Sequence, residues 1–158
     1  MVRLKHRYYL VNIIFDDDCL GHRIGHKVLY DAINSLLEDF YGDNGVACIQ
    51  SNLSVKYLNI YTNLILIRVR RQFHKMLGSV LPFIKSVKCD LLGKDKKLGR
   101  IVDCLVNTVH VSGTIRSAQK FIIKFNKKKI EIILQRCENE ALANKIRKSV
   151  FDKGTKII

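Results

Sequence analysis

The sequence has 158 residues, and its 28 Lys and Arg residues outnumber 14 Asp and Glu, so its formal net charge is +14 at pH 7. This length suits one domain, and a positive excess of this size predicts a polyanionic partner, above all nucleic acid. Hydrophobic residues make up 47% of the chain, which excludes a disordered basic tail, and no apolar run approaches the roughly 20 residues of a membrane span.

The beginning of the chain predicts a strand. Residues 5–15 are rich in β-branched and aromatic types on both parities, as in a strand buried on both faces. A basic start followed by an apolar stretch also resembles a secretory signal. We favour the strand because Asn12 interrupts the apolar stretch and Asp16–Asp18 occupy the place where a cleavage site needs small residues.

The middle of the chain predicts a helix, a hairpin and a second helix. Apolar residues recur at spacings of three and four over 24–40, and Gly42 ends this helix. Residues 46–58 and 61–70 favour two strands that form a hairpin. Helical spacing returns over 71–84, where Pro82 limits the helix.

The last part of the chain predicts one more strand and further helices. Gly113 permits a sharp turn after the strand, and Thr114 can cap the helix that follows. In chain order we expect a surface loop over 85–103, a strand over 104–112, a helix from Ile115, a helix over about 138–151 and a frayed tail over 153–158.

The order β-α-β-β-α-β with additional C-terminal helices predicts an α+β fold. It suits a four-stranded antiparallel sheet with two helices on one face, the ferredoxin-like or RNA-recognition-like arrangement, in one domain spanning 1–158. The strand over 61–70 lacks the aromatic motif with which RNA-recognition modules stack bases. We therefore expect recognition of RNA backbone and shape rather than stacking on single-stranded bases.

Charge is unevenly distributed along the chain. Residues 16–45 carry seven acidic and two basic groups, whereas 46–88 carry seven basic groups and no acid. A further seven basic residues against one acid lie in 104–137. This separation predicts that a polyanion meets one side of the molecule, away from the first helix.

Three groups of basic residues are candidates for RNA contact. Steps of four, four and three would align one group along the exposed side of the helix from Ile115, with no acid nearby to form intrahelical ion pairs. The alternative for each group is a solvated surface, or a frayed terminus for the first. The candidate RNA-binding residues are Arg3, Lys5 and Arg7; Arg68, Arg70 and Arg71; and Arg116, Lys120, Lys124, Lys127 and Lys128.

We expect no metal site and no catalytic site within the chain. Cys19, His22 and His26 could supply three zinc ligands, but no further Cys pair completes a structural site. Asp16–Asp18 favour an acidic turn, because consecutive carboxylates at a strand end cannot all face one metal ion. The five scattered cysteines predict free thiols in a reducing compartment, and His110 has no recognisable Ser or Cys partner.

Several segments resemble the Pop-five type protein subunits of ribonuclease P and ribonuclease MRP. They are residues 1–10, Val55-Lys-Tyr-Leu-Asn-Ile-Tyr-Thr62, Ile67-Arg-Val-Arg70, Leu81-Pro-Phe-Ile84 and, most specifically, residues 107–121 with Val111-Ser-Gly-Thr-Ile-Arg116. The resemblance runs in order from residue 1 to about 150.

The resemblance implies a non-catalytic, RNA-binding subunit in the nucleus and nucleolus. Its complex would contain ribonuclease P RNA, and MRP RNA in the second particle, would mature the 5′ end of precursor tRNA, and would process rRNA precursors. Mg²⁺ would be used by the catalytic RNA, and an Rpp-thirty type protein would be a partner. The family's N-terminal segment approaches the catalytic centre, which implies a role there for Arg3, Lys5 and Arg7. The residues alone leave two alternatives open: a ribosomal or other structural RNA-binding protein, and a free-standing small nuclease.

Overall fold

The computed structural model describes residues 4–16, 22–23, 25–91, 100–135, 144 and 147, and only the backbone of 22–23, 89–91, 100 and 133–134. In chain order the elements are β1 (His6–Phe15), β2 (His22–Arg23), α1 (His26–Gln50), β3 (Ser54–Asn59), β4 (Leu64–Arg70), η1 (Arg71–Phe73), α2 (His74–Val80), η2 (Leu81–Phe83), β5 (Ser86–Leu91), β6 (Arg100–Ser112) and α3 (Ile115–Gln135).

The strands form a six-stranded sheet in the order β2-β5-β6-β1-β4-β3, and every pairing is antiparallel. Its central part, β6-β1-β4-β3, has the order of a ferredoxin-like sheet, which confirms the predicted fold class. The short strand β2 and strand β5 extend the sheet at one edge. Strand β1 lies between β6 and β4, and residues 9–13 are all buried, as the sequence predicted for a central strand.

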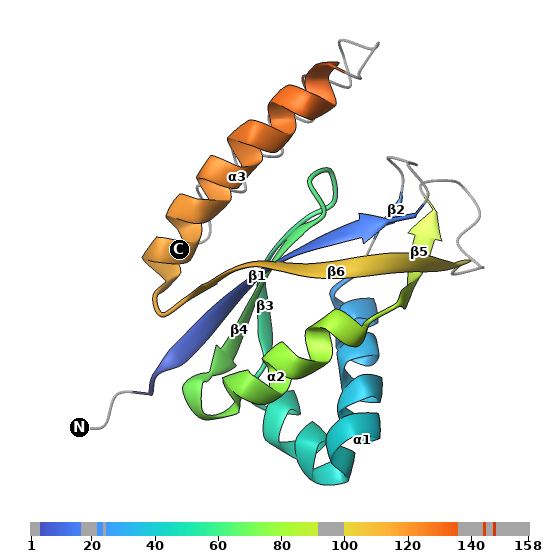
Figure 1. Ribbon diagram of the computed structural model, residues 1–158, viewed down its shortest axis with the longest axis vertical. Coiled ribbons are helices and arrows are strands. Elements are labelled where there is room, and N and C mark those ends of the chain that lie inside the picture. Colours follow the sequence, from blue (N-terminus) through green and yellow to red (C-terminus); the bar gives the residue numbers. More distant parts are fainter. Residues whose placement is uncertain are drawn as a thin grey trace.

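Helices cover both faces of the sheet (Figure 1). Helices α1 and α2 cover one face, where Tyr9, Val11 and Ile13 of β1 pack against buried residues of the two helices, such as Leu37 and Leu77. Helix α3 runs across the other face. There, Leu10 of β1 and Leu64 and Leu66 of β4 pack against Ala118 and Ile122. Strand residues thus alternate between two cores, which explains why β1 is apolar on both parities.

The helices and strands predicted over residues 24–84 occur in the expected order, but some of their bounds differ. Helix α1 extends through residues 46–50, which we expected to be a strand. Gly42 interrupts it with a positive φ of 63°, so the first helical segment does end there, but a second one follows and buries Gly45 and Ile49. The expected helix over 71–84 is divided into η1, α2 and η2, with Pro82 in the last. The hairpin of β3 and β4 is confirmed.

The predicted surface loop over 85–103 is also wrong at both ends. Residues 86–91 form β5 and residues 100–103 begin β6, and the two strands pair with Val87 opposite Val102. Both valines are buried against the core under α1 and α2. Burial of alternate residues against a distant helix layer outweighs the local Lys, Asp and Gly content, which is typical of loops.

Some expectations concern residues outside the described ranges. These are the interior of the loop at 92–99, the tail over 153–158 and most of the helix expected over 138–151, of which residues 144 and 147 are described and helical. No helix in the described part of the chain is long and apolar enough to cross a membrane.

Candidate nucleic-acid interface

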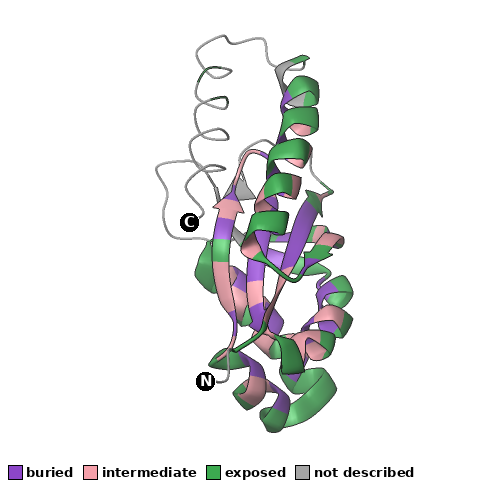
Figure 2. Cartoon of the chain, turned by 90° about the vertical axis from the view of Figure 1, so that its left-hand side faces the viewer, coloured by how far each residue is buried: buried purple, intermediate pink, exposed green. Residues whose placement is uncertain are grey.

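Helix α3 carries the longest run of exposed cations. The Thr114 hydroxyl oxygen accepts a hydrogen bond from the backbone N–H of Ser117 at 3.3 Å, so Thr114 caps the helix as predicted. Figure 2 shows the outer side of α3 exposed along its length, above buried strands. The predicted basic stripe consists of Arg116, Lys120, Lys124, Lys127 and Lys128, and all five residues are exposed. The structure therefore confirms that these residues share a solvent-facing side, while their contact with RNA stays a prediction.

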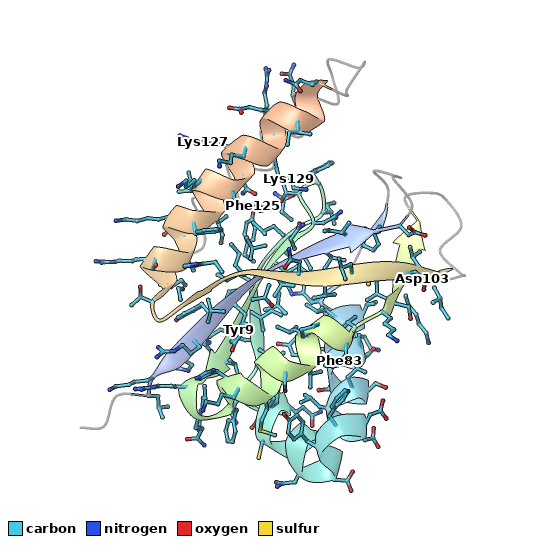
Figure 3. The ribbon with its side chains drawn as sticks, in the orientation of Figure 1. Tyr9, Phe83, Asp103, Phe125, Lys127 and Lys129 are labelled. Carbon is cyan, nitrogen blue, oxygen red and sulfur yellow. The ribbon has the colours of Figure 1, made fainter. Side chains whose placement is uncertain are left out.

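The opposite side of α3 holds the helix against the sheet. Ala118 and Ile122 are buried and Ile115 and Phe125 are half-buried. Figure 3 shows Phe125 on the side of α3 toward the sheet and Lys127 on the outer side. Apolar packing on one side thus fixes the direction in which the cations project.

A buried polar network adds to the attachment of α3. The Tyr57 hydroxyl on β3 accepts hydrogen bonds from the side-chain amides of Asn126 at 3.1 Å and Asn59 at 3.2 Å. Burial raises the pKa of Tyr57, which keeps the phenol protonated at neutral pH. The ring of His110 on β6 stacks on Phe121 of α3, with the ring centroids 4.5 Å apart. These polar and aromatic contacts position α3 relative to the sheet, in addition to the apolar packing on its buried side.

Helix α3 also covers the face with which RNA-recognition modules stack bases. Leu10, Leu64 and Leu66, on the two central strands of that face, are completely buried. Bases therefore cannot stack on these positions while α3 is in place. This agrees with the missing aromatic motif and favours contact with the RNA backbone.

A second group of cations gathers where β1 begins and β4 ends. The backbone N–H of Arg71 donates to the carbonyl of Lys5 at 2.9 Å, which joins the two segments, and both side chains are exposed. The guanidinium of Arg7 lies over the turn before α3, where a Cβ on Gly113 would come within 3.0 Å of an Arg7 nitrogen. A side chain at position 113 would therefore crowd the end of the Arg7 side chain, which would have to shift by a few tenths of an ångström. Arg3 lies outside the described residues.

Arg68 and Arg70 face the α3 side of the sheet, together with two residues that the sequence did not single out. His6 is directly opposite Arg70, and Lys56 lies in the irregular part of β3 beside them. We call His6, Lys56, Arg68 and Arg70 the sheet-end cluster. Burial lowers the pKa of His6, and the positive charges of Arg68, Arg70 and Lys56 lower it further. The strand pattern of β1 places His6 on the same face as Leu10, but the sequence could not reveal which residues of the neighbouring strands lie beside His6.

The acidic part of the molecule lies on the far side. Asp31, Glu38, Asp39 and Asp43 are exposed on α1, and α1 and α3 cover opposite faces of the sheet. The acidic residues of α1 and the basic stripe of α3 therefore lie on opposite faces of the sheet. Within the described residues no three or more His, Cys, Asp or Glu side chains form a group that could hold a metal ion. Cys19, Asp17, Asp18 and the His22 side chain lie outside that part.

The sequence profile of the Rpp14/Pop5 family matches residues 7–123, which is most of the chain. The chain belongs to the Rpp14/Pop5 family. This is the family of the Pop-five resemblance, which is therefore confirmed. The matched range contains β1 from Arg7 onward, the hairpin, the turn at Gly113 and the first part of α3 with Arg116 and Lys120. Lys124, Lys127 and Lys128 follow it.

Relatives cover nearly the whole chain. The chain is 37% identical over 150 residues to the ribonuclease P/MRP protein subunit POP5 of Bos taurus. The aligned region covers 95% of this chain and 84% of that protein. It is 36% identical to the Homo sapiens subunit, in an alignment that covers 95% of this chain and 87% of that protein. The Saccharomyces cerevisiae subunit is 30% identical, in an alignment that covers 84% of this chain and 82% of that protein. A chain in a cryo-EM structure of yeast ribonuclease MRP is similar with a TM-score of 0.47 and 15% identity, over 84% of this chain and 98% of that one.

Proposed function

We propose that this chain is the Pop5-type protein subunit of the ribonuclease P and ribonuclease MRP ribonucleoproteins. The observation that carries the proposal is the similarity to such subunits, at 36–37% identity over 95% of the chain. The chain itself is not the enzyme: it is a protein component of an RNA-based endoribonuclease. The protein subunit binds the RNA component and stabilises its active shape.

The cations described above provide the means of binding RNA. Exposed Lys and Arg side chains neutralise backbone phosphates and release counterions, and this stabilises a compact RNA without reading its sequence. The exposed stripe on α3 and the cations at the start of β1 support this mode of binding. We assign RNA contact to Arg3, Lys5, Arg7, Arg68, Arg70, Arg71, Arg116, Lys120, Lys124, Lys127 and Lys128.

The assembled particles would act on precursor tRNA at its 5′ end and on rRNA precursors. The Mg²⁺ ions of the reaction would be held by the RNA, as the family resemblance implies. Because the eukaryotic relatives are ribonuclease P/MRP subunits, we place the protein in the nucleus and, more specifically, in the nucleolus.

We propose an Rpp-thirty type subunit as a protein partner and assign it to an exposed aromatic pair. Phe40 of α1 and Phe83 of η2 are each about half exposed, and their ring centroids lie 4.9 Å apart. Aromatic residues of this kind are enriched at protein interfaces. Figure 3 shows Phe83 on the side of the sheet away from Phe125 and Lys127, so protein and RNA could bind together. The exposed apolar sheet residues Ile14, Ile101 and Leu105 form a second candidate surface for this partner.

Depletion of the protein in cells tests the proposed function. Precursor tRNAs that keep their 5′ leaders should accumulate, together with unprocessed rRNA precursors, and the wild-type gene should restore both. Loss of ribosomal subunits with normal tRNA ends would instead favour a ribosomal protein. Cleavage of RNA by the purified chain with Mg²⁺ alone would favour a free-standing nuclease.

A further inference from the structure

The sheet-end cluster brings His6 of β1 and Arg68 and Arg70 of β4 to one face of the sheet, and the positive charge of Lys56 on β3 acts on His6. Residues directly opposite in antiparallel strands share a face, with Cβ atoms roughly 5 Å apart. His6 of β1 is opposite Arg70 of β4, and Arg68 is opposite Ser54 of β3. The even-numbered residues of β1 continue from His6 toward Leu10, which α3 buries. The cluster therefore occupies the part of this face just beyond the core under α3.

The cluster has an excess of positive charge, and one of its side chains, Arg68, is oriented by a hydrogen bond. The Nε–H of Arg68 donates to the Ser54 hydroxyl at 3.1 Å, which orients the guanidinium and leaves its terminal nitrogens for another acceptor. The charged groups that act on His6 are Arg68 and Arg70 from β4 and Lys56 from β3, and all are cations. The sequence has no acid over 46–88, which includes both strands of the hairpin. An anion with several acceptor oxygens would satisfy these donors.

We propose that His6, Lys56, Arg68 and Arg70 form a single binding site for one backbone phosphate of the RNA, and that His6 takes up a proton when the phosphate binds. The neutral imidazole avoids repulsion from the three cations in the free protein. A phosphate between them reverses this balance, because its negative charge favours the imidazolium. The proposal rests on the proposed function and adds His6 and Lys56 to its RNA contacts.

Proton uptake gives the site a signature that a general basic surface lacks. If His6 gains a proton on binding, the affinity for ribonuclease P RNA rises as the pH falls from about 7.5 to about 5.5, by up to about tenfold per pH unit. In the full-length variant His6→Gln this component should disappear. The matched control His26→Gln removes an exposed imidazole from the start of α1, on the other side of the sheet, and should keep the wild-type pH dependence.

Substitution of Arg70 in the cluster supplies a second test. Arg70→Gln should weaken RNA binding by about tenfold and reduce the slope of log K against log salt by about one. Lys27→Gln on α1 removes one positive charge from the acidic side and should change neither. Thermal unfolding of each variant shows whether it is folded at the binding temperature, and Arg70→Lys separates loss of charge from loss of the guanidinium.

NMR of the His6 ring distinguishes the sources of the phosphate. Addition of ribonuclease P RNA should raise the pKa of His6, and inorganic phosphate should do so weakly. A response to inorganic phosphate with none to RNA would overturn the assignment to RNA. Equal pH dependence in the wild type and His6→Gln would overturn the site while leaving the proposed function intact. Failure of the wild-type protein to bind ribonuclease P RNA would instead contradict the proposed function.

Discussion

Removing two cations from the basic stripe should weaken RNA binding in a measurable and specific way. Arg116 and Lys120 are exposed, lie one turn apart on the same side of α3, and precede the part of the helix that extends beyond the family match. Substitution of both by Gln keeps helix propensity nearly constant. Because neither residue belongs to the buried side of α3, the free energy of unfolding should change by no more than about 0.5 kcal/mol.

The expected magnitude comes from the number of phosphate contacts that are lost. Each contact contributes about 0.7–0.9 to the slope of log K against log salt, so the double variant should lose about 1.4–1.8. At a fixed moderate salt concentration the affinity should fall by roughly 10- to 100-fold, because two hydrogen bonds between a cation and a phosphate are lost and such charge-assisted bonds are stronger than neutral ones.

The assay is a titration of ribonuclease P RNA with the full chain over a series of salt concentrations. Lys27→Gln with Lys75→Gln is the matched control, because both exposed lysines lie on the helices of the opposite face and their loss changes the net charge equally. A slope that is the same in wild type and in the stripe variant would refute the assignment. A slope lowered equally by the control would show a diffuse effect of net charge rather than contact by the stripe.

Three further predictions concern the framework of the interface. Ile122→Ala on the buried side of α3 should cost about 2–4 kcal/mol in urea unfolding, whereas the adjacent exposed Ile123→Ala should cost less than about 1; equal losses would contradict the docking of α3. Because folding lowers the pKa of His6 from 6.5, the unfolded chain binds more protons, so stability should fall below pH 6.5 and continue to fall until the pH passes the lowered pKa. Unfolding of His6→Gln should lack this component, and a wild-type-like pH profile would argue against it. Tyr9→Phe removes the 2.8 Å hydrogen bond to the His74 carbonyl and should cost about 1 kcal/mol by thermal unfolding, and an unchanged variant would show that water replaces it.

The fold class and the central strand could be predicted from local patterns. Residues 5–15 are apolar on both parities because β1 has a helix layer on each side, and α3 has a capping residue and a regular apolar side. Strands β5 and β6 could not be predicted at their ends, because their pairing depends on the burial of Val87 and Val102 under distant helices. The interruption at Gly42 was visible, but the helical segment after it depends on packing.

The cationic stripe could be predicted, but the sheet-end cluster could not. Spacing along one helix is enough to place Arg116 and Lys120 on the same side. The proximity of His6, Arg68 and Arg70 depends on the register between β1 and β4, whose paired residues are more than fifty positions apart in the chain. Sequence alone therefore grouped Arg68 and Arg70 with Arg71 at a junction and passed over His6.

Purification of the tagged protein from cells, followed by sequencing of the RNA that accompanies it, tests the central claim most directly. The proposed function predicts enrichment of ribonuclease P RNA, with MRP RNA in the second particle, and both should fall when the stripe on α3 is neutralised. Recovery of ribosomal RNA in ribosome-sized particles, with neither of these RNAs enriched, would contradict the claim.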